Sequence, residues 1–397
     1  LPLGSLENRI THLKSKTSPA SIPFPRFLTP EIARLVGYVI ADGTICGNDV
    51  CLFNHSLELR GDFFRCAKKA FGISGTTTRL RTTWRANLHS GALASLLEAA
   101  FQVPKGRKAR IVSIPALIQR AGPEPLAAFL RALFDCEGSV SIREREIEFT
   151  TASRALAAAL PGPLLRFGIV ARVRKKPLKG WTYYRLSFYG KENLTNFQRS
   201  IGFLHKEKAR KLAAAIRRGK QDTNIDVVPG AGKAFWSILQ KTGETRASLA
   251  KRIGVSPGLV GLWIAEDRRP SRHLLQRIVR RLERWDAPII ANELRFLRTL
   301  ARSDMLWARI EAVEAVPAAS KHVYDLTVAG SHTFLAGASA PMVVSNTTVL
   351  NVLSLFIRPT LKVVSIEDTP ELRLPLPHWV PHVARSAISV KGKTGEV

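Results

Sequence analysis

The chain has 397 residues, 45% of them hydrophobic, which is enough to bury several cores, so we expect two to four domains. Its 60 Lys and Arg against 31 Asp and Glu give a formal net charge of +29 and predict a nucleic-acid partner, although acidic substrates or membrane surfaces would respond to the same charge. No apolar run has membrane-spanning length, no signal-peptide pattern occurs and the four cysteines lack CxxC spacing, so we expect a cytoplasmic protein with free thiols, no membrane insertion and no zinc site.

Two stretches share one pattern, an apolar amphipathic helix that ends in an acidic residue followed by Gly. The first runs from Leu35 to Gly43 and the second, about 95 residues later, from Leu130 to Gly138. Alternating residues typical of strands follow each helix. If the two helices pack side by side, Asp42 and Glu137 meet at one end as an acidic pair suited to a metal ion.

This duplicated pattern resembles the LAGLIDADG homing endonucleases. The downstream order is also repeated, since each half continues into a helix that ends in F-G-I, at Phe71–Ile73 and Phe167–Ile169. The resemblance implies an α+β fold of two pseudo-symmetric αββαββα repeats, residues 29–121 and 122–218, with residues 1–28 as a linker or remnant. It also implies double-stranded DNA as the partner and cleavage of both strands.

The same resemblance implies roles for four side chains. Asp42 and Glu137 are implied as ligands of Mg²⁺, which hard oxygen ligands favour over zinc. Lys108 and Lys208 stand where the family tends to keep a lysine near the cut phosphate, whose negative charge a cation offsets in hydrolysis. The neighbouring lysines that compete for this role are Lys105, Lys206 and Lys211.

Basic residues alternate with aromatic and β-type positions in both halves. A twisted antiparallel sheet with this pattern fits a DNA major groove, where Arg reads guanine and other cations hold phosphates. A merely solvated basic strand is the alternative. The residues expected to contact DNA are Arg79, Arg81, Arg85, Arg143, Arg145, Arg172, Arg174, Lys175, Lys176 and Arg185.

Residues 219–295 are expected to form a helical module. The segments 245–255 and 256–265 have the helix, Gly-containing turn and second helix of a helix-turn-helix of the phage-repressor type, which they resemble. This predicts DNA contacts near the start of the second helix; a helical linker without DNA contact is the alternative. The residues nearest DNA would be Ser256, Gly258, Arg268 and Arg269.

The segment 296–346 resembles the C-terminal splicing motifs of inteins. Three motifs follow in order, V-Y-D-L-T-V from Val323, H-T-F-L-A from His332 and M-V-V-S-N-T from Met342, and residues 304–310 resemble the strand that precedes them. The resemblance implies the all-β C-terminal half of a Hint splicing domain. A plain β-hairpin with a satisfied histidine is the alternative.

Splicing of this kind ends when an Asn amide attacks its own backbone carbonyl and releases the next residue. The resemblance implies Asn346 as the cyclising residue, His332 as its acid or base, and Thr347 as the hydroxyl nucleophile that receives the acyl chain beforehand. Ser345 stands where such motifs usually carry His.

Residues 347–397 resemble archaeal type II/IV secretion ATPases (pilus or flagellar-type motors) just after their phosphate-binding loop. A helix is expected from Thr347 and a buried strand at 361–368. In the spliced, oligomeric host, Thr347 would complete the loop as a ligand of Mg²⁺ and ATP, and Glu367 would be a catalytic acid. The chain itself has no such loop, so ATP is no cofactor of this chain.

A complete intein begins with Cys or Ser and carries a T-x-x-H segment well before the endonuclease, whereas this sequence begins with Leu1 and has no T-x-x-H in the 41 residues before Asp42. We therefore expect a fragment whose N-terminal splicing half is supplied upstream in cis or in trans. The alternatives for the whole chain are a catalytically inactive DNA-binding intein remnant, a DNA-binding regulator, an RNA maturase, or a motor ATPase. The two acidic residues argue against the regulator and the maturase, and the missing phosphate loop argues against the motor.

Overall fold

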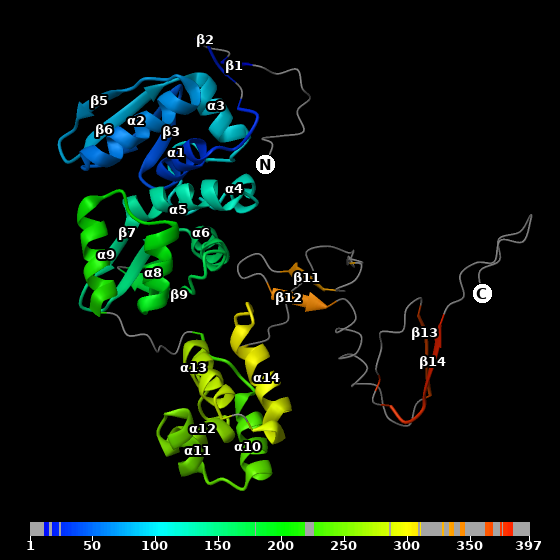
Figure 1. The fold of residues 1–397 in the computed structure, drawn as a ribbon. Coiled ribbons are helices and arrows are strands. Elements are labelled where there is room, and N and C mark those ends of the chain that lie inside the picture. Colours follow the sequence, from blue (N-terminus) through cyan, green and yellow to red (C-terminus); the bar gives the residue numbers. More distant parts are fainter. Residues whose placement is uncertain are drawn as a thin grey trace, which may run out of the picture. The chain divides into compact units, whose positions relative to one another are not determined.

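The computed structural model describes residues 12–15, 18–23, 25–178, 180–218, 226–285, 287–308, 310, 328, 333–336, 342–345, 362–367, 374 and 376–383. The chain divides into two compact units, residues 1–311 and 312–397. Figure 1 shows their helices and strands. No helix among the described residues is long and apolar enough to cross a membrane.

The first repeat alternates helices with pairs of strands. Its elements are α1 (Pro30–Ile40), β3 (Gly43–Cys46), β4 (Asp49–Phe53), α2 (Leu57–Phe71), β5 (Thr76–Arg79), β6 (Trp84–His89) and α3 (Gly91–Ala99). The strands form an antiparallel sheet in the order β3-β4-β6-β5. Before them, β1 (His12–Ser15) pairs with β2 (Ser18–Pro23), and Ile22 of β2 is buried in the core, so part of the predicted linker is folded.

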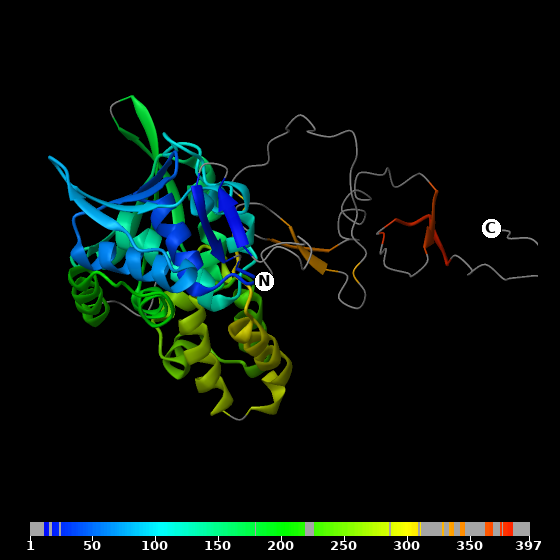
Figure 2. The ribbon, with the colours of Figure 1, turned by 90° about the horizontal axis from the view of Figure 1, so that it is seen from above.

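The second repeat follows the same plan. Its elements are α4 (Ala116–Gln119), α5 (Pro123–Glu137), β7 (Gly138–Ser141), β8 (Glu146–Thr151), α6 (Arg154–Ala159), α7 (Pro161–Leu165), β9 (Arg172–Leu178), β10 (Trp181–Tyr189), α8 (Lys191–Ser200) and α9 (Lys206–Arg218). The sheet order β7-β8-β10-β9 repeats that of the first sheet, which confirms the predicted duplication. The β9–β10 hairpin extends beyond the body of its repeat (Figure 2).

Helices α1 and α5 pack against each other at the centre of one core that spans both repeats. Thr29 caps the start of α1 by accepting a hydrogen bond from the Ile32 amide at 3.4 Å, and Pro123 begins α5. At the crossing there is room only for hydrogen, because a Cβ on Gly37 would lie 2.7 Å from the Phe129 carbonyl oxygen and 2.8 Å from the Ala132 Cβ. Small residues thus set the approach of the two helices.

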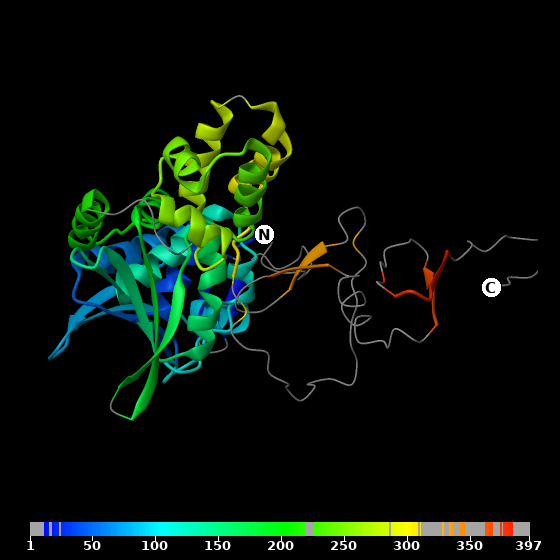
Figure 3. The same ribbon diagram turned by 90° about the horizontal axis from the view of Figure 1, so that it is seen from below.

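A bundle of helices with its own core follows residue 226 (Figure 3). It consists of α10 (Ala231–Thr242), α11 (Arg246–Ile253), α12 (Pro257–Ile264), α13 (Arg272–Glu283), the short 3-10 helix η1 (Pro288–Ile290) and α14 (Ala291–Arg302). Leu297 and Ala301 of α14 are buried in this core, so the bundle extends past the predicted boundary at residue 295. The strand expected at 304–310 is wrong for residues 304–308, which form neither helix nor strand.

In the second unit the structure describes strands and a few short stretches beside them. In it, β11 (Thr333–Ala336) pairs antiparallel with β12 (Met342–Ser345), and β13 (Val363–Glu367) pairs parallel with β14 (Trp379–Val383). The strand predicted at 361–368 is present but not buried, because Val364 and Ile366 are 53% and 72% exposed. The helix expected from Thr347 lies outside the described residues.

The crossing of α1 and α5 gives a first prediction. Gly37→Ala should lower the free energy of unfolding by about 1–3 kcal/mol, since the added methyl meets a backbone oxygen that cannot move aside cheaply. Gly61→Ala in α2 is the matched control: its Cβ meets nothing within 4 Å, and Ala favours helix over Gly by up to about 1 kcal/mol. Urea unfolding measures both, and equal stabilisation by both substitutions would contradict the close approach.

Candidate active site

Two carboxylates meet where α1 and α5 end. Asp42 follows the last turn of α1, Glu137 is the last residue of α5, and the two side chains are within hydrogen-bonding reach of each other. The Nδ2 of Asn54 donates to Asp42 Oδ2 at 2.7 Å and holds that carboxylate in place. The predicted acidic pair is therefore present in the fold.

A lysine caps the C-terminal end of each helix. The ammonium of Lys108 donates to the carbonyls of Ile40 and Ala41 at 2.7 and 3.2 Å. The ammonium of Lys208 donates at 2.6–3.4 Å to the last carbonyls of α5, those of Phe134, Asp135 and Cys136. The structure thus brings both predicted lysines to the carboxylate pair, in matching positions of the two repeats.

The competing lysines lie elsewhere in surface ion pairs. Lys105 pairs with Glu98 at 2.5 Å, Lys206 with Glu58 at 3.4 Å, and Lys211 with Glu207 at 2.7 Å. None of these three ammonium groups contacts the carbonyls that end α1 or α5.

Burial and mutual repulsion shift the pKa values of the groups around the two carboxylates. Desolvation at the helix ends and the negative charge of Asp42 raise the pKa of Glu137 to about 7, although part of its side chain remains exposed. Burial lowers the pKa of Lys108 and of Lys208, while the two carboxylates oppose that shift. Burial and the charge of Asp42 also keep the Cys136 thiol protonated by raising its pKa.

The donor set fits a hard divalent cation. Among the described residues no cluster of three or more His, Cys, Asp or Glu side chains exists, so the protein offers two carboxylates at this point. Mg²⁺ is commonly held by one or two carboxylates together with waters and phosphate oxygens. Asp42 and Glu137 would be the protein ligands, and the raised pKa of Glu137 marks the negative charge that such a cation would neutralise.

Asn54 was not predicted from the sequence. It directly follows β4, and its Oδ1 accepts from the Ser56 amide at 2.9 Å, which fixes the side chain for its bond to Asp42. In the second repeat Thr151 occupies the matching place before the α6 cap, with its Oγ1 accepting from the Ser153 amide at 3.1 Å. The sequence signal that could have indicated this role was an Asn two residues before Ser56, the residue that caps α2.

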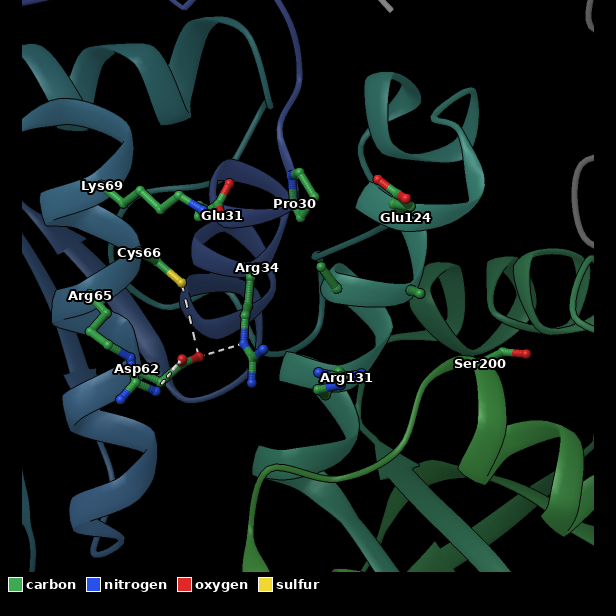
Figure 4. A pocket seen from close by; sticks show the side chains of 12 residues that line it. Pro30, Glu31, Arg34, Asp62, Arg65, Cys66, Lys69, Glu124, Arg131 and Ser200 are labelled. Carbon is green, nitrogen blue, oxygen red and sulfur yellow. Dashed lines mark hydrogen bonds and ion pairs between the residues drawn. The ribbon is translucent and has the colours of Figure 1, made fainter.

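Two cavities flank the helix pair. One of about 360 Å³ adjoins the site and is lined by Lys108, Glu137 and residues of the second sheet. The other, of about 500 Å³, lies along the N-terminal halves of α1 and α5 (Figure 4). It contains the ion pairs of Asp62 with Arg34 at 2.5 Å and Arg65 at 2.7 Å, and none of the predicted catalytic residues.

The residues expected to contact DNA lie on the strands and turns of the two sheets. Arg79 ends β5, Arg85 is in β6, Arg185 is in β10, and the basic run 172–176 is in β9. The turn residues are Arg81, Arg143 and Arg145. In the helical bundle, Ser256 precedes α12, whereas Arg268 and Arg269 follow it and are exposed.

The residues implied in splicing are only partly described. Ser345 ends β12 opposite Thr333, and Glu367 ends β13. His332, Asn346 and Thr347 lie outside the described residues.

Residues 29–97 and 124–202 match the family model of a LAGLIDADG-like domain. The chain therefore contains a LAGLIDADG-like domain of two repeats. One matched segment begins just before α1 and the other in the first turn of α5, so the family match and the observed duplication coincide.

Beyond the LAGLIDADG-like domain model, the chain is similar to long proteins of different function. It is 30% identical over 234 residues to an A-type ATP synthase subunit of Pyrococcus abyssi, in a match that covers 59% of this chain and 21% of that protein. It is 32% identical over 202 residues to the replication factor C small subunit of Methanocaldococcus jannaschii, covering 50% and 11%. The chain thus spans about a fifth or less of these relatives. A structure of I-DmoI with DNA and Mn is similar at 14% identity and TM-score 0.35, covering 44% of this chain and 98% of that one.

The raised pKa of Glu137 predicts a pH dependence of stability. Folded protein retains a proton on Glu137 between its ordinary pKa of 4.5 and about 7, where the unfolded chain has lost it, so this group's contribution to stability falls as the pH rises through that window. Relative to wild type, Glu137→Gln should gain stability across the same window in EDTA, measured by urea unfolding at several pH values. Glu98→Gln, which removes an exposed ion pair, is the control. If plots of unfolding free energy against pH are parallel for wild type and Glu137→Gln, the raised pKa of Glu137 is contradicted.

Proposed function

We propose that the two-repeat domain is a site-specific DNA endonuclease that cuts both strands with Mg²⁺ held by Asp42 and Glu137. The observation that carries this proposal is the pairing of two carboxylates with two lysines, the buried Lys108 and the half-buried Lys208, at the point where α1 and α5 end. A divalent ion held there would supply Lewis-acid stabilisation of negative charge on the phosphate and would activate water for attack. The sheets on either side offer Arg and Lys on strands, the residue types that hold phosphates and read guanine.

The chain's own residues have defined parts in this proposal. Asp42, oriented by Asn54, and Glu137 bind the cation through oxygen. Lys108 and Lys208 place positive charge beside the carboxylates, where they stabilise negative charge that develops on a cut phosphate. Because burial lowers the pKa of both ammonium groups, they are also placed to give a proton to a leaving oxygen.

We further propose that this endonuclease is carried by an intein inserted in a secretion-type ATPase. Support comes from the relatives, which include a replication factor subunit and an ATP synthase subunit. The matches cover 11% and 21% of these proteins, as a mobile insert shared by unrelated hosts would. The splicing motifs are a second support, because β11 and β12 place Thr333, which follows His332, opposite Ser345, which precedes Asn346.

The helical bundle adds a second DNA contact in this proposal. α11 ends at Gly254 in the left-handed conformation, with φ of 70°, and α12 begins at Pro257, the geometry of a tight turn between two helices. Ser256, Gly258, Arg268 and Arg269 lie at the two ends of α12, on its solvent side. An inactive DNA-binding remnant or an RNA maturase would need the same basic surface, but neither needs two carboxylates capped by lysines.

DNA cleavage tests the endonuclease. With Mg²⁺ and a plasmid carrying the intein-free insertion sequence of the ATPase gene, wild type should linearise the plasmid, and EDTA should stop it. The Asp42→Asn/Glu137→Gln double variant should lose cleavage by about 100-fold or more but keep DNA binding. Lys108→Met should also slow cleavage, because its ammonium lies beside the carboxylates. Lys105→Met is its control, because Lys105 pairs with Glu98 instead. Undiminished cutting by the double variant would sink the assignment.

Mass spectrometry tests the splicing segment. On long incubation the wild-type chain should release a fragment that begins at Thr347, slowly, because Asn cyclisation requires the amide to be held against its own carbonyl. Asn346→Ala should release none, whereas Asn351→Ala, which changes a nearby Asn outside the motif, should behave as wild type. Equal release from wild type and Asn346→Ala would mean that proteolysis breaks the bond.

A further inference from the structure

The uncovered face of the second sheet carries acidic side chains among its basic ones. Ile147, Phe149, Leu186 and Phe188 of β8 and β10 are buried in the core. Side chains alternate along a strand, so Glu146, Glu148 and Arg185 all point to the opposite face, the one proposed to meet DNA. Neither glutamate was among the DNA-contact residues expected from the sequence.

These acids bind the cations beside them. The Nε of Arg185 lies 3.0 Å from Glu148 Oε2, and its Nη2 forms an ion pair with Glu146. The ammonium of Lys176 on β9 lies 3.4 Å from Glu148 Oε1, and the Thr150 hydroxyl donates to the same oxygen at 3.0 Å. The acids are the more buried partners, with side chains 15% and 23% exposed against 38% for Arg185 and 47% for Lys176.

The first sheet is arranged differently. On its matching face Asp49 accepts from Asn87 at 3.1 Å and lies 2.8 Å from His89 Nδ1, while Arg85 has no ion pair within the described part of the chain. Among the described residues, ion pairs of a carboxylate with Arg or Lys therefore occur on the proposed DNA face of the second sheet and not on that of the first, where Asp49 pairs with His89. Composition does not require this pairing, because the chain has almost two basic residues for each acidic one.

We infer that Glu146, Glu148, Arg185 and Lys176, here called the paired cluster, make the second sheet the selective half of the DNA interface and direct it to a G·C pair. The inference rests on the proposed DNA binding. DNA phosphates can draw Arg185 and Lys176 away from the glutamates, but the two partly buried carboxylates are then left unpaired and facing a polyanion. This electrostatic cost weakens binding to any DNA that offers the carboxylates no hydrogen-bond donor.

A G·C pair removes that penalty. In the major groove guanine presents O6 and N7 to an arginine, and the paired cytosine presents its N4 amino group to a carboxylate. Arg185 flanked by Glu146 and Glu148 offers this donor and acceptor set side by side. The acids therefore weaken general binding, and this cost is offset only where a cytosine N4 amino group donates a hydrogen bond to one of them.

The Glu146→Gln/Glu148→Gln double variant tests the cluster. Its affinity for random duplex should rise by about 10- to 100-fold, and the slope of log affinity against log salt should steepen by about 1.8, because two cations become free to hold phosphates. The matched control is Glu98→Gln/Glu207→Gln, which removes the same charge from lysine pairs on α3 and α9. Fluorescence anisotropy measures both at several salt concentrations.

Discrimination is the second readout. In the intein-free insertion sequence, each G·C pair is replaced by A·T in turn. One of these replacements should weaken wild-type binding by about 10-fold or more, and the double variant should not distinguish that DNA from the original. If wild type binds duplex DNA but the double variant matches its control in affinity, slope and preference, the inference is wrong while the endonuclease proposal stands. If wild type binds no duplex DNA, both are wrong.

Discussion

The close approach of α1 to α5 is the constraint on which the rest of the structure depends. Gly37 leaves room for the Phe129 carbonyl, so the two helices cross tightly enough for their last residues to meet. The site then collects four sources of negative charge, two carboxylates and the C-terminal ends of two helix dipoles. Lys108 and Lys208 offset this charge by donating to the carbonyls at the helix ends, while burial and the charge of Asp42 raise the pKa of Glu137. In the proposed function, a divalent cation would balance the remaining negative charge.

A network of buried charges holds the same helices on the side away from the carboxylates. Asp62 of α2 accepts from the Tyr38 hydroxyl at 2.8 Å and pairs with Arg34, whose guanidinium also lies 3.8 Å from Asp135. Asp135 in turn accepts from the amides of Leu204 and His205 at 3.0 and 3.1 Å. Removal of one partner would leave a buried charge unpaired, so the network ties α1, α2 and α5 into one register.

The large positive charge is therefore divided into groups with separate tasks. Lys108 and Lys208 bind the helix ends, Arg34 lies in the helix interface, and the basic residues on the strands and turns of the two sheets are among those exposed to a polyanion. Within that last group the second sheet holds Arg185 and Lys176 in ion pairs. Net charge by itself accounts for attraction to DNA, whereas the pairing decides which cations are free.

The sequence alone determined the duplicated fold and the helix-ending acids Asp42 and Glu137, because periodicity and repeat spacing are local patterns. Lys108 and Lys208 were implied only by the family resemblance, and the structure separates them from the competing lysines by their contacts with the helix ends. The splicing residues remain predictions that depend on motif order. Only the tertiary structure showed that Asn54 holds Asp42, that α14 belongs to the helical core beyond residue 295, and that β13 exposes Val364 and Ile366. The acidic partners of Arg185 were also hidden in the sequence, since Glu146 lies 39 residues away and only strand register brings it alongside. Contacts of this kind are set by how helices and strands pack, which no local pattern encodes.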